Sequence, residues 1–378
     1  MFPKQTVKDT EIQGQTVLVR VDYNVPLGDA GEITDDLRIR ASLPTLNYLR
    51  QSGAAKIILI SHLGRPKGEP KPELSLRPVA ERLQQLLTED AAHPASASSE
   101  TSEETPGASE APSVTFVPAV SGPAVEDVVK NTTNGNFVLL ENLRFFPGEE
   151  ADSADFAQSI VASTGATLFV QDGFAVIHRA HTSTSAITKE LPSVAGFLVE
   201  NEVEKLKTVA EAPEKPFVIV LGGAKVEDKH PLIDRLEPLA DAIFVGGKIA
   251  ADGYSSDNPK IHVCTTFADA EKHDIGAPCL EKLLGLVQTA KTVLWNGTLG
   301  QAEIPEFAKG SEALADLLGS RSDITSVVCG GDTSGFVENY QKAHENLKFS
   351  LISTGGGASL ELLSGLPLPG LDCIDDRA

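Results

Sequence analysis

The chain has 378 residues, of which 41% are hydrophobic, so it is long enough to form two domains with separate cores. It carries 53 acidic against 32 basic residues, a net charge of -21, which argues against a nucleic-acid backbone or an anionic membrane as partner. No apolar run is long enough to span a bilayer, and residues 1–5 lack a signal-peptide pattern. The four cysteines have no regular spacing, which favours reduced thiols in a cytoplasmic protein.

The first half of the chain alternates short apolar runs with stretches of helical periodicity. The apolar runs lie at 16–21, 55–60, 136–140 and 167–170, and their length and branched side chains predict buried strands. Residues 35–40 are predicted to precede a helix that carries Leu43, Leu46 and Leu49. Strands that alternate with helices predict a parallel, doubly wound α/β sheet.

Basic side chains recur where these predicted strands end. The set consists of Arg38, Arg65, Arg144 and Arg179, together with His62. One exposed arginine is most often a solvated surface charge, but four at equivalent positions in an acidic protein indicate a single basic pocket. Open α/β sheets bind ligands at the carboxyl ends of their strands, and guanidinium groups suit carboxylates and phosphates. This half of the chain therefore predicts a binding site for an anion.

Two other stretches concern the organisation of the chain. Residues 88–112 are rich in alanine, serine, proline and acidic residues and contain no lysine or arginine, which predicts a disordered surface insertion. Residues 192–206 start with proline and then show helical spacing between two α/β patterns. They are predicted to form an inter-domain helix.

The second half of the chain repeats one unit, in which a strand-like run is followed by glycines. The runs lie at 217–221, 242–245, 292–295, 327–329 and 349–352. Glycine turns let backbone N–H groups approach an anion, and a following helix adds the positive end of its dipole. The Walker and dinucleotide-binding fingerprints are absent, so backbone amides are predicted to hold a nucleotide.

Charged residues accompany these turns. Asp332 follows Gly330 and Gly331 at a predicted strand end, where a carboxylate suits a phosphate-bound Mg²⁺. Lys225 and Lys229 lie four residues apart and are predicted to share one helical face as mobile cations near the phosphates. Their alternative interpretation is a pair of solvated helix charges.

Eight segments resemble the successive motifs of the phosphoglycerate kinase family, in that family's order. They lie at 17–26, 62–66, 140–145, 178–181, 222–226, 295–297, 330–333 and 353–358. The resemblance covers nearly the whole chain apart from the acidic insertion. It implies reversible phosphoryl transfer between 1,3-bisphosphoglycerate and ADP, giving 3-phosphoglycerate and ATP in glycolysis, with Mg²⁺ as cofactor. It also implies a cytoplasmic monomer with no nucleic-acid or membrane partner.

The resemblance carries roles to individual residues. The acid substrate would be bound by Asp22, Tyr23, Asn24, Arg38, His62, Leu63, Gly64, Arg65, Arg144 and Arg179. The nucleotide would be bound by Ala224, Lys225, Lys229, Gly246, Asn296, Glu303, Gly330, Gly331, Asp332 and Thr333. Asp332 would hold the metal, mainly through the nucleotide. The catalytic set would be Arg38, Lys225, Gly355 and Gly356.

The resemblance also implies two doubly wound domains joined by a hinge helix. The N-terminal domain would span 1–191 and bind the acid, and the C-terminal domain would span 192–370 and bind the nucleotide. Residues 371–378 would return to the N-terminal domain. Closure about the helix at 192–206 would bring the substrates together.

One departure and two alternatives remain open. Lys248 replaces a small or apolar residue of the family, and 246–274 is shorter than usual, which leaves the nucleotide base undecided. The first alternative is a non-catalytic nucleotide-binding relative. The second is an acyl-phosphate kinase that acts on another carboxylic acid.

Overall fold

The computed structural model describes residues 2–92, 112–224 and 229–377. The chain forms two compact units: the first runs to Asn201 and resumes at Pro369, and the second runs from Glu202 to Leu368. Each unit contains one six-stranded parallel sheet with helices packed against it. The predicted α/β class with two doubly wound sheets is confirmed.

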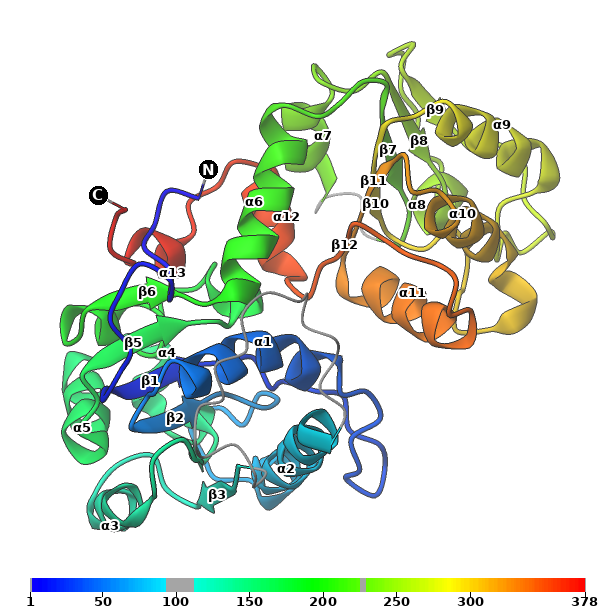
Figure 1. Ribbon diagram of the computed structural model, residues 1–378. Coiled ribbons are helices and arrows are strands. Elements are labelled where there is room, and N and C mark those ends of the chain that lie inside the picture. Colours follow the sequence, from blue (N-terminus) through cyan, green and yellow to red (C-terminus); the bar gives the residue numbers. More distant parts are fainter. Residues whose placement is uncertain (1, 93–111, 225–228, 378) are drawn as a thin grey trace. The chain divides into compact units, whose positions relative to one another are not determined.

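The sheet of the first unit has the strand order β3-β4-β2-β1-β5-β6. Figure 1 labels β1, β2, β3, β5 and β6 of this sheet. The strands are β1 (Thr16–Arg20), β2 (Lys56–Ile60), β3 (Val114–Val117), β4 (Phe137–Leu140), β5 (Leu168–Gln171) and β6 (Ser193–Ala195). The strand order changes direction between β1 and β5. A crevice opens beyond the carboxyl ends of the strands at such a switch point, which is where α/β sheets bind ligands.

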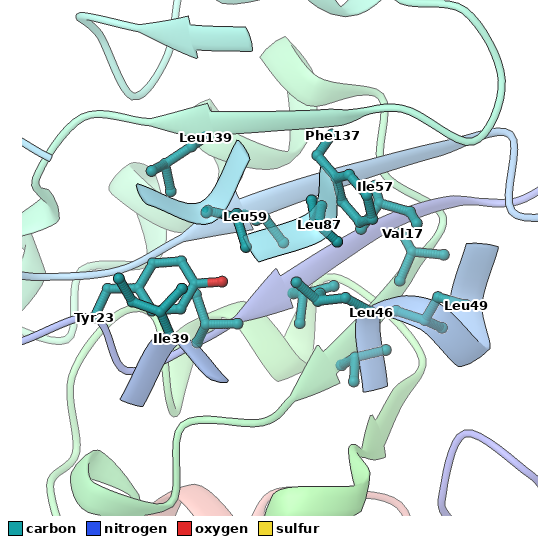
Figure 2. Packing of buried hydrophobic residues seen from close by; sticks show 14 of the residues in the cluster. Val17, Tyr23, Ile39, Leu46, Leu49, Ile57, Leu59, Leu87, Phe137 and Leu139 are labelled. Carbon is teal, nitrogen blue, oxygen red and sulfur yellow. The ribbon is translucent and has the colours of Figure 1, made fainter. Parts of the chain in front are cut away.

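Helices cover both faces of this sheet because its strands are apolar on both sides. The helices of this unit are α1 (Leu37–Gln51), α2 (Arg77–Ala92), α3 (Pro123–Asn131), α4 (Pro147–Glu150), α5 (Ala154–Thr164) and α13 (Pro369–Asp372). Val17 and Leu59 pack with residues of α1 and α2, such as Leu46, whereas Leu18 packs with residues of α3 and α5. Figure 2 shows the first of these two clusters.

The second unit repeats the plan with the strand order β12-β11-β10-β7-β8-β9. Its strands are β7 (Phe217–Leu221), β8 (Ala242–Val245), β9 (Ile261–Val263), β10 (Thr292–Asn296), β11 (Thr325–Cys329) and β12 (Leu351–Ile352). Its helices are α7 (His230–Leu236), α8 (Gly247–Ala251), α9 (Ala277–Gln288), α10 (Lys309–Gly319), α11 (Gly331–Ala343) and α12 (Gly357–Leu363). Here the order changes direction between β7 and β10, the strands that end at Leu221 and Asn296.

The inter-domain segment differs in its bounds from the prediction of a helix over 192–206. Its first residues form β6, paired with β5, and helix α6 spans Phe197–Glu211. The change of unit falls between Asn201 and Glu202, inside this continuous helix. Periodicity did not separate the strand from the helix because Ser193–Ala195 is too short to show a period of two.

The acidic low-complexity stretch begins later than predicted. Helix α2 continues to Ala92, and within it Glu89 pairs with Arg82 while Asp90 accepts a hydrogen bond from Asn47. The start at residue 88 is therefore wrong, because these acidic residues extend an existing helix. Residues 93–111 lie outside the described residues.

The prediction of four reduced thiols is also wrong. Cys264, directly after β9, and Cys279, in the first turn of α9, form a disulfide, with their Cα atoms 5.5 Å apart. The pairing arises from the tertiary packing of β9 and α9, which the sequence spacing does not reveal. Cys329 and Cys373 are free. Within the described residues, no helix has the length and apolar character needed to cross a bilayer.

A buried carboxylate directly after β5, which contacts the first turn of α6, predicts a pH-dependent stability. Asp172 accepts a hydrogen bond from the Leu198 N–H at 3.0 Å, its other oxygen has no partner among the described residues, and burial raises its pKa to about 8. Between pH 4 and 8 the folded state then holds more protons than the unfolded state, so the free energy of unfolding falls as pH rises. We expect Asp172→Asn to flatten this fall by about 1 kcal/mol or more between pH 5 and 8, measured by urea unfolding.

The exposed Asp127 of α3 offers a matched control. Asp127→Asn should leave the pH dependence of the wild type unchanged. Parallel pH profiles for Asp172→Asn and the wild type would contradict the role given to Asp172.

Candidate functional site

A cluster of charged side chains lies at the carboxyl edge of the first sheet. Asp22, just beyond β1, pairs with Arg38 and lies 3.7 Å from Nδ1 of His62. Arg20, the last residue of β1, donates from Nη2 to the same His62 nitrogen at 3.1 Å. Arg38 lies in the first turn of α1 and not at a strand end as predicted, but that turn returns to the same edge. The fold therefore brings these residues together.

Arg144 brings buried N–H groups to this cluster, and not all of them are hydrogen-bonded within the described residues. Its side chain is 4% exposed, and Nη1 donates to the carbonyl of Gly64 at 2.9 Å. Nε lies 3.3 Å from a Glu150 oxygen without forming a directed hydrogen bond, and the buried Nη2 has no partner among the described residues. Leaving the buried N–H groups of a cation without hydrogen-bond partners costs free energy. An anionic ligand would satisfy them.

Burial and, after it, neighbouring positive charges lower the pKa values of two side chains at this edge. Burial, followed by the charges of Arg20, Arg144, Arg38 and Arg179, holds the pKa of His62 well below its usual value. Burial and the neighbouring Arg179 lower the pKa of Arg144 to about 10. His62 is therefore neutral near pH 7 and can donate one hydrogen bond without adding charge.

Four further residues predicted for this site lie in different surroundings, some buried and one exposed. Asn24 accepts a hydrogen bond from the Gly64 N–H at 2.8 Å and so fixes the turn after β2. Leu63 is buried, and Arg65 is exposed. Tyr23 is buried in the core (Figure 2), and its hydroxyl lies 3.0 Å from that of Ser42.

Sequence reasoning missed the support beneath the arginines. Arg20 is buried, and its Nε donates to Ser183 Oγ at 2.7 Å, which in turn donates to Glu149 at 2.6 Å. Glu149 is also buried, and burial raises its pKa although Arg20 opposes the shift. The one signal in the sequence was a charged Arg20 within the apolar run 17–21. Buried charges need partners, and this run offered none nearby.

In the second unit a cavity of about 1150 Å³ lies beside the glycine turns. Three residues predicted for nucleotide binding line it, namely Ala224, Glu303 and Asp332. Lys248 also lines it, as the departure from the family pattern suggested. Phe336 and Tyr340 contribute apolar surface from α11. A cavity with aromatic surface and a few charged groups suits a nucleotide.

Buried polar groups join the turns after β7, β10 and β11. Asn296, at the end of β10, donates to the carbonyl of Cys329 at 3.0 Å and accepts from Lys229. Thr333 accepts a hydrogen bond from the Gly297 N–H at 2.8 Å. At Gly330, φ is 95° and an added Cβ would meet Asn296 Nδ2 at 2.9 Å, so this turn requires glycine. Asn296 and Thr333 therefore hold these turns in position through hydrogen bonds.

Asp332 occupies a position that suits a metal ligand. It is exposed on the cavity wall at the second residue of α11, whose N-cap is Gly330. No hydrogen-bond or ion-pair partner is found for it within the described residues. A free carboxylate beside a helix N-terminus offers the hard oxygen that Mg²⁺ prefers. The donor set therefore fits a Mg²⁺ carried by a nucleotide.

The triple-glycine turn is held from α6 by a carboxylate that the sequence did not single out. Glu202 is 1% exposed and accepts hydrogen bonds from Thr354 N at 2.7 Å and Thr354 Oγ1 at 2.8 Å. Within the part of the chain that the structure describes, its other oxygen has no partner, and burial raises the pKa of Glu202 to about 7. Gly355 is buried beside this contact, and Gly356 is half-buried with φ of 50°. Glu202 thus positions the residues that precede α12.

The remaining predicted residues have these positions. Lys225 lies outside the described residues, so the shared helical face predicted for Lys225 and Lys229 is not described either. Lys229 directly precedes α7. Gly246 is the buried N-cap of α8, and Gly331 is the exposed first residue of α11.

Comparison with known proteins gives a consistent result. The family described as phosphoglycerate kinase matches residues 7–261 and 254–366. A phosphoglycerate kinase of Akkermansia muciniphila is 40% identical over 427 residues, covering 99% of this chain and 98% of that protein. The enzyme of Fervidobacterium nodosum is 38% identical over 425 residues, covering 99% of each chain.

Solved structures agree with the sequence relatives. Phosphoglycerate kinase from Pyrococcus horikoshii superposes with a TM-score of 0.79 at 26% identity, and that from Coxiella burnetii with 0.73 at 28%. Each comparison covers 98% of both chains.

Proposed function

The chain belongs to the phosphoglycerate kinase family, and from this premise we propose which of its residues perform the reaction. The enzyme transfers a phosphoryl group reversibly between 1,3-bisphosphoglycerate and ADP, giving 3-phosphoglycerate and ATP. The chemistry requires two anionic substrates to be held against the charge of an acidic protein. Positioning and charge neutralisation then lower the barrier, without a covalent enzyme intermediate.

We assign the acid substrate to the charged cluster of the first unit. The observation that carries this assignment is Arg144, a buried cation that lies near the neutral His62 and whose Nη2 has no partner among the residues that the structure describes. Arg144 and Arg179 would hold the phosphate and carboxylate of 3-phosphoglycerate, and His62 would donate a hydrogen bond. Arg38, held at the rim by Asp22, would contact the phosphoryl group in transfer.

We assign the nucleotide to the cavity of the second unit. Glu303 would accept a hydrogen bond from the ribose, and Lys225 and Lys229 would contact the phosphates. The N–H groups of the turns at Gly331 and Gly355 would provide further donors. Asp332 would hold Mg²⁺ through the nucleotide, and the ion would neutralise charge on the phosphate oxygens. The proposal further includes acid binding by the unit that ends at Asn201, nucleotide binding by the unit that begins at Glu202, and a cytoplasmic monomer.

A coupled assay with competing acceptors tests the choice of acid. We expect ATP-dependent phosphorylation of 3-phosphoglycerate, and neither acetate nor aspartate should be turned over or inhibit at equal concentration. Faster turnover of acetate or aspartate than of 3-phosphoglycerate would favour an acyl-phosphate kinase that acts on another carboxylic acid. Nucleotide binding without any turnover would favour a non-catalytic relative.

A further inference from the structure

One wall of the nucleotide cavity belongs to a loop that a disulfide closes. The loop, residues 264–279, runs from the end of β9 to the first turn of α9, and Cys264 and Cys279 join its two ends. Glu271, Lys272 and His273, at its tip, line the cavity. The position of this wall therefore depends on whether the two sulfur atoms are bonded to each other.

Hydrogen bonds join the two arms of the loop between the disulfide and the tip. Thr266 accepts from the Gly276 N–H at 2.8 Å, and Asp274 accepts from the Ala268 N–H at 3.0 Å. Phe267 and Ile275 form a β-bridge between the two arms. The loop is thus a small ladder whose open end lies at the disulfide, so releasing that end frees both arms.

The loop also supports the segment that carries Glu303. His273 accepts a hydrogen bond from the Gln301 N–H at 3.0 Å, and its ring stacks on Phe307 at a centroid distance of 4.3 Å. The buried Asp274 accepts from the Gly310 N–H at 2.9 Å. Displacement of the loop would move both the loop wall and the residue proposed to contact the ribose.

The surroundings of Cys279 suit exchange chemistry. Its sulfur lies 3.4 Å from the Thr266 N–H nitrogen and 3.1 Å from the Thr266 hydroxyl, at the N-terminal end of α9. Two donors and a helix N-terminus favour a negatively charged sulfur once the bond is open. Cys279 is 8% exposed and Cys264 is 2% exposed, so a small thiol meets Cys279 first.

We propose that Cys264 and Cys279 form a dithiol–disulfide switch that sets the nucleotide affinity of this cavity. The inference rests on the proposed nucleotide site. In the reducing direction, a small thiolate attacks the sulfur of Cys279, and the sulfur of Cys264 leaves as a thiolate and takes up a proton. A second small thiolate attacks the small-molecule sulfur of the mixed disulfide, releasing the small-molecule disulfide and the Cys279 thiolate. The oxidised form holds the wall in place, and the reduced form binds nucleotide more weakly.

Calorimetric titration of Mg-ADP into two preparations of the full chain tests the proposal. One preparation is equilibrated with glutathione disulfide and the other with dithiothreitol, and thiol titration counts the free cysteines in each. We expect two fewer thiols in the oxidised form and an ADP affinity weaker by about fivefold or more after reduction. Binding of 3-phosphoglycerate, measured on the same samples, should not change.

Two variants make the result specific. Cys264→Ser with Cys279→Ser should bind Mg-ADP as the reduced wild type does and should not respond to dithiothreitol. Cys373→Ser, which removes a free thiol of the other unit, should respond as the wild type does. Equal affinities of the two wild-type forms, or no loss of thiols with glutathione disulfide, would overturn the switch alone. Absence of Mg-ADP binding in both forms would overturn the nucleotide site and the switch together.

Discussion

Replacement of Arg38 by alanine is expected to lower kcat by about a hundredfold or more, while KM for 3-phosphoglycerate changes by about threefold or less. Arg38 lies at the rim of the arginine cluster, about a quarter exposed and paired with Asp22, whereas Arg144 lies buried beneath it. The buried cation would hold the bound acid in both ground and transition states. The rim cation would act most strongly on charge that develops as the phosphoryl group moves.

Arg40 provides the matched control for this prediction. It lies on the same helix, is exposed, and pairs with Asp36 at 2.9 Å away from the cluster. Arg40→Ala should leave both constants close to wild type in a steady-state assay. If kcat of Arg38→Ala remained within about threefold of wild type, the role of Arg38 in transfer would be wrong.

Asp332→Asn is expected to weaken binding of Mg-ADP by about tenfold or more and to leave 3-phosphoglycerate binding unchanged. An amide has the shape of the carboxylate but no charge to offset the desolvation of Mg²⁺. The competing interpretation was a helix cap, for which asparagine serves equally well. Gly330 is the N-cap of α11, and Asp332 has no hydrogen-bond partner among the described residues, which favours the ligand role.

Calorimetric titration with and without Mg²⁺ separates a metal ligand from a general effect on the cavity. The variant should lose ADP affinity only when Mg²⁺ is present. Asp252 lines the same cavity but pairs with Lys248 at 2.7 Å, so Asp252→Asn should not show this dependence on Mg²⁺. Equal ADP affinities for wild type and Asp332→Asn in Mg²⁺ would exclude the metal role.

The fold could be predicted from the sequence because local patterns determined it. Apolar runs such as 16–21 and 217–221 became parallel strands, since strands buried on both faces leave a continuous apolar signal. Polar residues directly after the strands, such as Asp22 and His62, came together because parallel strands end at one edge. Very short strands do not leave such a pattern, and β6 was wrongly predicted to be part of a helix.

The supports of the site could not be predicted because their partners are distant in sequence. Glu149 reaches Arg20 through Ser183, and Glu202 reaches Thr354, 152 residues further along the chain. No periodicity marks a buried carboxylate. The disulfide was missed for the same reason, since only the packing of β9 against α9 brings its sulfurs together.

The return of the chain at Pro369 has a consequence for the order in which the protein is made. The first unit is not contiguous: Gln5 and Ser193 both hydrogen-bond with the main chain of Asp375, the latter through the Asp375 N–H. During synthesis these partners emerge only after all of the second unit, from Glu202 to Leu368, has been translated. At ordinary elongation rates the nascent first unit waits roughly 10–30 s for its last ten residues, exposed to chaperones and proteases.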